Sequence, residues 1–288
     1  MEEKIVCLKN GFVRLVDRMP TECPPGRNME FAIVQAARVS YGQGVKDPQT
    51  DAGLIDYLYR NGHTSPFEMV KFKFHIKCPL FVARQMMRHR TANVNEFSQR
   101  YSEVPDTFYR PSEISPKECP GGGIRYQDQR NKQGSVGTDN TAAADAVGEN
   151  DFVRDTFCDI ERKLEEVFSL YKELIDNGVS REVARFCLPT ATYTEFYFCI
   201  DLHNLLKLLK LRMDAHAQPE IQVYANAMHD LIAPHVPNVM KCFNEYTTGS
   251  VCLSRNEIEV FTGKKTVESL GSKRKQEEYR HKIDQFEN

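Results

Sequence analysis

The chain has 288 residues, enough for one large domain or two small ones with a sizeable core. Its 38 lysines and arginines nearly cancel its 40 acidic residues, so the net charge of −2 disfavours a general electrostatic attraction to nucleic acid. Apolar residues make up 41% and charged residues 27%, which is ordinary for a globular protein and excludes general disorder.

Targeting and metal-binding patterns are both missing from the sequence. No apolar run approaches the ~18 residues of a membrane span, and the first ten residues, MEEKIVCLKN, open with charges instead of an apolar signal core. The nine cysteines include no C-x-x-C pair, and no two of the eight histidines stand four apart. We therefore expect a cytoplasmic protein with reduced thiols, no metal site and no membrane partner.

Hydrophobic periodicity and chain-breaking residues predict helices and strands along most of the sequence. The clearest strand is 70–77, where Val70, Phe72 and Phe74 alternate with charged side chains. In chain order, the prediction comprises extended segments at 4–8 and 12–16, helices over 28–40 and 47–60, a strand over 70–77, a helix over 79–90, a helix over 151–176, a strand over 190–200, and helices over 201–212 and 217–231.

Two segments depart from this pattern. Residues 115–149 contain Gly121, Gly122 and Gly123, an alanine run and few large apolar groups, so we predict a flexible insertion that need not pack. The tail after Gly271 is highly charged, which indicates a solvated helix or disorder.

The densest polar stretch is 88–101, with the sequence R-H-R-T-A-N-V-N-E-F-S-Q-R-Y. A charge run of this kind is often only a solvated surface. Here, however, arginine forks suit phosphate and flat rings, and the Asn, Ser and Glu side chains can bind ring edges. The mixture therefore favours an anionic, planar ligand.

A second polar cluster lies in the predicted helix 201–212. His203, Lys207 and Lys210 share one face, whereas Arg212 lies on roughly the opposite side. Five leucines among them predict a helix that is buried nearly all round. Buried cations need anionic partners, and either Asp201 and Asp214 or ligands could supply them.

Several single residues receive structural interpretations. Ser98 has no base at an obvious spacing, so a hydroxyl that hydrogen-bonds phosphate is favoured over a nucleophile. Cys78 and Cys187 are interpreted as buried thiols, and His216 and Gln218 as helix caps. The absence of a G-x-G-x-x-G turn and of a P-loop disfavours the common nucleotide-binding folds.

Taken in order, these motifs resemble a known family. Arg88-His89-Arg90, seven further residues and Ser98 are similar to the signature of the flavin-dependent thymidylate synthases, the thymidylate-synthase-complementing family. The matching motifs also include N-G-H-T-S-P-F-E at 61–68, N-E-x-S-x-R-Y-S at 95–102, F-Y-R-P at 108–111, R-E-x-A-R-x-x-L-P at 181–189, and L-R-M-D-A-H-A-Q at 211–218 with Glu220-Ile221. The resemblance spans about 28–245, apart from the insertion at 115–149.

The resemblance implies a fold and a reaction. The fold is α+β, an antiparallel sheet flanked by helices in a single catalytic domain at 1–250, with the insertion at 115–149 and a charged tail at 251–288. The reaction is reductive methylation of dUMP to dTMP in dTTP biosynthesis, with FAD as cofactor and with NADPH and 5,10-methylenetetrahydrofolate as co-substrates. The family members are homotetramers with shared active sites, and nucleic acid is not a partner.

The resemblance also implies the site residues. The cofactor residues are His63, Ser65, Arg88, His89, Arg90, Glu96, Asp201, Leu202, His203 and Lys207. The substrate residues are Gln85, Met86, Met87, Arg88, Glu96, Phe97, Ser98, Gln99, Arg100, Arg185 and Arg212. Arg212 is the catalytic residue, because it matches the arginine credited with ionising N3 of dUMP. Asp201, His203 and Lys207 depart from the commonest family pattern of Asn, Arg and Asn.

Two alternatives remain open at this point. The first is an enzyme that attacks C6 of dUMP with a cysteine thiolate. The second is a non-enzymatic basic module that binds nucleotides or nucleic acid through Arg88, Arg90 and Arg100.

Overall fold

The computed structural model describes residues 3–40, 42, 49–128, 134–137 and 151–287. The chain forms two compact units, Met1–Val239 and Met240–Asn288, each of which is described by itself. The domain boundary predicted at residue 250 therefore stays a prediction.

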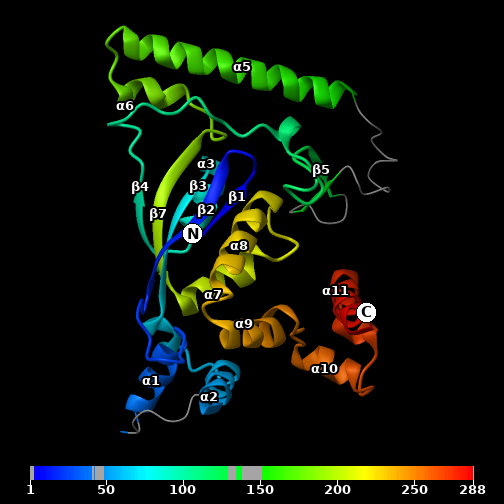
Figure 1. Ribbon diagram of the computed structural model, residues 1–288. Coiled ribbons are helices and arrows are strands. Elements are labelled where there is room, and N and C mark those ends of the chain that lie inside the picture. The colour runs from blue at the N-terminus through cyan, green and yellow to red at the C-terminus, as the bar shows by residue number, and fades with distance from the viewer. Residues whose placement is uncertain (1–2, 41, 43–48, 129–133, 138–150, 288) are drawn as a thin grey trace. The chain divides into compact units, whose positions relative to one another are not determined.

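A five-stranded antiparallel sheet organises the first unit (Figure 1). Its strands, in spatial order, are β1 (Lys4–Cys7), β2 (Gly11–Met19), β3 (Lys71–Pro79), β7 (Tyr193–Asp201) and β4 (Asn93–Glu96). Phe72, Phe74 and Ile76 of β3 are fully buried, as their alternation with charged residues predicts. The predicted α+β fold with an antiparallel sheet is thus confirmed.

Helices α3, α7 and α8 pack against the sheet and one another. The helices of this unit are α1 (Phe31–Val39), α2 (Gln49–Arg60), η1 (Ser65–Met69), α3 (Leu80–Met86), η2 (Pro111–Glu113), α5 (Asp151–Asp176), α6 (Arg181–Ala184), η3 (Arg185–Cys187), α7 (Leu202–Arg212) and α8 (Pro219–Ile232). Most bounds lie within three residues of the predicted ones, because apolar periodicity and Gly, Pro or Asn breakers agree there.

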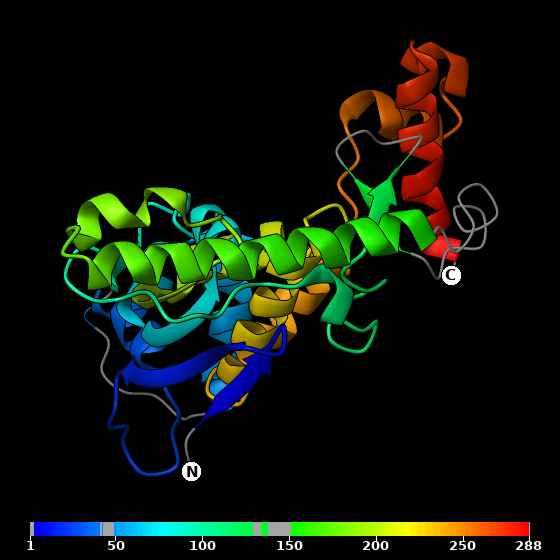
Figure 2. The same ribbon diagram turned by 90° about the horizontal axis from the view of Figure 1, so that it is seen from above.

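Helix α5 is a single long helix outside the sheet (Figures 1 and 2). Its buried Phe168 and Tyr171 form a separate small core with Val104, Phe108 and Ala184. The Tyr171 hydroxyl accepts a hydrogen bond from the Val104 backbone N–H at 3.1 Å. This core attaches the segment that follows β4 to helix α5.

One prediction on local structure is wrong, and one strand was not predicted. Helix α3 ends at Met86, not at residue 90, so Arg88-His89-Arg90 lies in a turn after the helix. The polar segment Asn93–Glu96 forms strand β4, although it lacks the apolar alternation from which a strand is predicted. It forms because its backbone pairs with β7, with Val94 opposite Phe198.

Part of the predicted flexible insertion is packed. Strands β5 (Arg125–Gln127) and β6 (Ser135–Gly137) form a hairpin. Cys119 is fully buried beside it, and Gly121 lies so close to Gly137 that a side chain there would clash. The expectation that 115–149 need not pack is therefore wrong for 115–128 and 134–137, and 129–133 and 138–150 lie outside the described residues.

The second unit is helical. After α9 (Pro237–Phe243), it contains η4 (Asn244–Thr248), α10 (Arg255–Phe261), η5 (Val267–Leu270) and α11 (Lys273–Glu287). Ser254 and Glu257 form a capping box at the start of α10, and Lys282 of α11 donates to Glu257 at 2.8 Å. The charged tail is thus a helix, one of the two predicted forms. No described helix has the length and apolar composition of a bilayer span.

Gly11 offers a test of this packing. A Cβ at Gly11 would collide with the Tyr224 hydroxyl of α8 and would lie 2.6 Å from the Lys77 carbonyl oxygen. We predict that Gly11→Ala lowers the free energy of unfolding by roughly 1–3 kcal/mol, because the core there is overpacked. Denaturant titration measures the change.

The matched control is Gly53→Ala in α2, where an added Cβ meets nothing within 4 Å. This substitution should be neutral or stabilising, since alanine is the better helix former. Equal destabilisation by the two substitutions would contradict the packing of α8 on Gly11.

Candidate active site

Helix α7 is positioned by Asp201, the last residue of β7. The Asp201 carboxylate accepts from the Asn204 backbone N–H at 2.9 Å and from the Asn204 side chain at 2.8 Å. The helix is buried on its leucine face only, because Lys207 and Lys210 are exposed. The prediction of a helix buried all round is therefore wrong, and neither lysine needs a buried anionic partner.

The predicted cofactor residues at the start of α7 lie beside η1. We name His63, Ser65, Asp201, Leu202, His203 and Lys207 the cofactor group. The Leu202 backbone N–H donates to the Val70 carbonyl just after η1, at 2.8 Å, and the His63 ring stacks on Tyr57. The pKa of His203 is lowered by partial burial and by the Lys207 charge, although Glu68 and Asp201 oppose this.

Arg212, at the other end of α7, meets the turn after α3. Its Nε donates to His89 Nε2 at 3.1 Å, and its Nη2 donates to the Gln85 backbone carbonyl at 3.3 Å. We name Arg212, His89, Gln85 and Arg88 the arginine group. Met86 is fully buried, and Met87 is partly buried, so both support this turn.

The charges in the arginine group are mutually unfavourable. Burial and the Arg212 charge lower the pKa of His89 to about 4. Burial and the nearby Arg88 in turn lower the pKa of Arg212. His89 is therefore neutral near pH 7, and because its Nε2 accepts from Arg212, its proton lies on Nδ1. Two guanidinium groups that converge on one place favour an anion between them.

The remaining predicted substrate residues are the last residue of β4, the four residues after it, and Arg185 at the start of η3. We name Glu96, Phe97, Ser98, Gln99, Arg100 and Arg185 the loop group. Glu96 accepts from Thr194 at 2.8 Å, and the Ser98 hydroxyl accepts from the Arg100 backbone N–H at 3.3 Å. Arg100 forms an ion pair with Glu182 of α6 at 2.8 Å. The buried Gln99 Nε2 has no hydrogen-bond partner.

The cofactor group and the loop group lie at opposite ends of β7. Phe97 bonds to Glu195 near one end of this strand, whereas α7 begins after Asp201 at the other (Figure 1). Asp201 lies six residues after Glu195, and six extended residues span about 20 Å. The structure of one chain therefore brings the predicted residues into local groups, and it does not bring all of them into one cavity.

Exposed cations occur in two of the places that the sequence singled out. Arg88, Arg90 and Lys207 are exposed, and none forms an ion pair within the described part of the chain. Such a donor set fits a ligand with phosphate groups. Among residues 3–287, with the stated gaps, no cluster of His, Cys, Asp or Glu is arranged for a metal ion.

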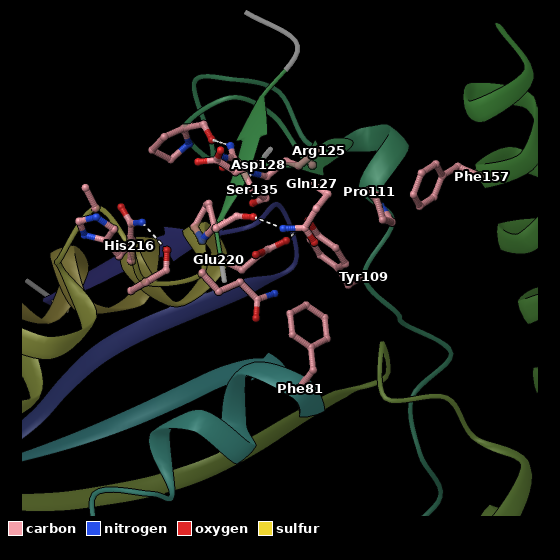
Figure 3. A pocket seen from close by; sticks show the side chains of 18 residues that line it. Phe81, Tyr109, Pro111, Arg125, Gln127, Asp128, Ser135, Phe157, His216 and Glu220 are labelled. Atoms are coloured by element: carbon pink, nitrogen blue, oxygen red, sulfur yellow. Dashed lines mark hydrogen bonds between the residues drawn. The ribbon is translucent and has the colours of Figure 1, made fainter. Parts of the chain in front are cut away.

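A pocket of about 780 Å³ lies beside the arginine group. Phe81, Tyr109 and Glu220 form one wall, and the β5–β6 hairpin with Arg125 forms another (Figure 3). Gln218 also lines the pocket, and its Oε1 accepts from Gln85 Nε2 at 2.6 Å. Sequence reasoning interpreted Gln218 as a helix cap, and only its position after Arg212 in the same motif could have linked it to the site.

The chain matches a family model described as thymidylate synthase complementing protein, over residues 15–238. It is 46% identical over 274 residues to a protein of Dictyostelium discoideum named flavin-dependent thymidylate synthase, with 92% of this chain and 84% of that protein covered. A protein of the same name from Treponema denticola is 44% identical, with 90% and 88% covered.

Solved structures are similar as well. A UMP/dUMP methylase, PolB, from Streptomyces cacaoi bound with 5-Br UMP superposes with a TM-score of 0.65 at 29% identity, covering 83% of this chain and 95% of that chain. The same methylase bound with 5-Br dUMP also superposes with a TM-score of 0.65, covering 84% of this chain and 97% of that chain.

His89 should titrate near pH 4 instead of near its usual ~6.5. The unfolded chain then takes up a proton at a higher pH than the folded chain does. The free energy of unfolding should therefore fall as the pH drops from about 6.5 to about 4. NMR titration of the imidazole measures the pKa.

Replacing Arg212 with Met removes the Arg212 charge, which is the smaller of the two causes that lower the pKa of His89. The pKa of His89 should then rise part of the way, since burial remains. A wild-type His89 that titrates at 6.5 or above would contradict the electrostatics of the arginine group.

Proposed function

The chain belongs to the thymidylate synthase complementing protein family, and we propose that the arginine group binds the uracil base of dUMP for methylation. The protein is an FAD-dependent methyltransferase that acts on dUMP. We infer that 5,10-methylenetetrahydrofolate supplies the carbon and NADPH the reducing equivalents. The cytoplasmic location expected from the sequence stays a prediction.

The contact that carries this proposal is the one between Arg212 and His89. Because neutral His89 and the Gln85 carbonyl hold Nε and Nη2, the guanidinium plane is oriented while Nη1 remains available to a ligand. An arginine stays protonated in proteins, so Arg212 is not a literal base. Its fixed charge instead stabilises an anionic uracil, in which negative charge spreads over N3 and the two carbonyl oxygens.

An anionic uracil suits the reaction without an enzyme nucleophile. Loss of the N3 proton makes the ring more electron-rich, which favours attack by C5 on an electrophilic one-carbon unit. Arg88 adds a second positive charge, and its repulsion with Arg212 is relieved when the anion binds.

The exposed cations suit the cofactor. Arg88, Arg90 and Lys207 would hold the phosphates of FAD, with His63, Ser65 and His203 beside them. Once reduced by NADPH, bound FAD would supply the hydride that completes the methyl group, and this redox chemistry belongs to the cofactor. The Asp201 carboxylate caps α7, so we expect it to fix the position of this helix and not to contact the cofactor.

We infer that a second copy of the chain completes each site, as in the homotetramer that the resemblance implies. The groups lie apart along β7, and the loop group and the arginine group have exposed apolar neighbours. Val94 is 41% exposed in β4, Leu211 is 55% exposed before Arg212, and Phe186 is 80% exposed after Arg185. Covering such side chains is favourable, so they support association close to the site residues.

Neither alternative from the sequence is supported. Cys78 is fully buried, and burial raises the pKa of its thiol well above the ordinary value, so it is not a thiolate nucleophile. Arg100, assigned to a nucleic-acid surface in the other alternative, is paired with Glu182. Family membership in turn favours the enzyme over a binding module.

Arg212→Lys tests the proposal directly, because lysine keeps the charge but loses the planar fork. We predict that it slows dTMP formation roughly a hundredfold and weakens dUMP binding, while FAD stays bound. The measurements are flavin absorbance after desalting, dUMP titration and tritium release from C5-labelled dUMP.

The control is His203→Ala combined with Lys207→Ala, which should lose FAD first. If Arg212→Lys sheds FAD while the double variant keeps it, the assignment of the two ends of α7 is wrong. If Arg212→Lys turns over normally, stabilisation of the uracil anion by Arg212 is wrong.

Subunit mixing tests the shared site. Arg212→Lys and Arg185→Ala should each be nearly inactive, because one damages the arginine group and the other the loop group. Co-expressed with different tags, they should form mixed assemblies that regain activity, since some sites then combine two intact groups. No recovery in mixed assemblies would mean that both groups act from the same chain.

A further inference from the structure

The connection between α7 and α8 holds Gln85 from two sides. Arg212, the last residue of α7, donates to the Gln85 backbone carbonyl at 3.3 Å. Gln218, which immediately precedes α8, accepts from the Gln85 side-chain Nε2 at 2.6 Å. One short connection, 213–217, therefore separates two residues that bind the main chain and the side chain of the same glutamine.

Gln218 occupies a position where a side chain is expected to cap the following helix. It is the N-cap residue of α8, a position at which side chains usually accept from the first backbone N–H groups of the helix. Gln218 makes no such bond, and Pro219 at the first helical position has no N–H to satisfy. The interpretation of Gln218 as a side-chain cap is therefore wrong, and its amide is directed to Gln85 instead.

The backbone around Gln218 is held in place. The Asp214 side chain accepts from the His216 backbone N–H at 2.8 Å. The Asp214 backbone carbonyl accepts from the Ala217 backbone N–H at 2.9 Å. Gln222 Nε2 donates to the Ala217 carbonyl at 2.7 Å. The next turn is anchored by Glu220, which is buried and accepts from the Tyr109 hydroxyl at 2.9 Å. Gln218 thus approaches Gln85 from a braced turn.

The direction of the bond decides what Gln85 can offer. Because Gln218 Oε1 accepts from Gln85 Nε2, the Gln85 amide is turned so that its Oε1 and its second N–H remain available. A uracil base presents carbonyl oxygens on both sides of N3, and the free N–H of Gln85 can donate to a carbonyl oxygen in neutral dUMP and in its N3 anion alike. A reversed amide would exchange the positions of donor and acceptor and lose this match.

We propose that Gln218 is a positioning residue for the methylation of dUMP, acting by holding the Gln85 carboxamide in the orientation that meets the base. The inference rests on the proposed function, which places Gln85 in the dUMP site. Gln218 itself does not touch the substrate. Its effect is therefore on base binding and orientation, and it depends on Gln85.

The test is a double-mutant cycle with Gln218→Met, Gln85→Met and the combined variant, each as the full chain loaded with FAD. Methionine has nearly the length of glutamine but no strong acceptor. Gln218→Met should raise the dissociation constant of dUMP about three- to tenfold, the equivalent of one lost hydrogen bond. Flavin content after desalting should not change.

The decisive comparison is made in the Gln85→Met background, where Gln218→Met should have no further effect on dUMP binding. The matched control is Gln222→Met, which removes a bond within the same turn. It should lower the unfolding temperature at least as much as Gln218→Met does, yet leave the dissociation constant of dUMP unchanged.

The proposal is overturned if Gln218→Met binds dUMP as the wild type does. It is also overturned if the effects of Gln218→Met and Gln85→Met simply add, because Gln218 would then act independently of Gln85. Equal losses of dUMP affinity in Gln218→Met and Gln222→Met would reduce its role to support of the turn. Failure of the proposed function itself is seen separately, as a wild-type protein that binds FAD but forms no dTMP.

Discussion

The pairing of β3 with β7 is the constraint on which the rest of the structure depends. Nine consecutive residue pairs run from Lys71 opposite Asp201 to Pro79 opposite Tyr193. At one end of this ladder, η1 precedes β3 and α7 follows β7. At the other end, α3 follows β3 and the loop group joins β4. A shift of register by one residue would exchange the buried and exposed faces and would also displace the cofactor group from its partners.

The arginine group shows how the fold holds charges that oppose one another. A neutral His89 accepts from Arg212, while Arg88 adds a repulsive charge nearby. The strands and helices that hold this arrangement draw their stability from fully buried residues such as Phe74 and Phe198. The site is thus unfavourable when empty of anions and favourable when one binds, which is the preorganisation that electrostatic catalysis needs.

Sequence reasoning succeeded where a strong local pattern and the tertiary structure agree. The alternation in β3 and the long amphipathic pattern of α5 led to nearly correct bounds. It failed for β4, because the polar Asn93–Glu96 becomes a strand only through pairing with β7. It also failed for Gln218, since no local pattern shows that a residue at a helix start bonds to a helix 133 positions away in sequence. Burial around α7 was overestimated, because leucine content does not show which face meets the core.

Strand β4 has a consequence for how copies of this chain can associate. It is the edge strand next to β7, and all four of its residues are exposed. A longer, apolar edge would offer its backbone to the edge of another molecule, and sheets could then grow without limit into fibrils. With four residues, of which only Val94 is apolar, β4 is a poor template for such growth. Edge pairing through β4 would therefore add little to the association proposed above, which relies on side chains beside the site.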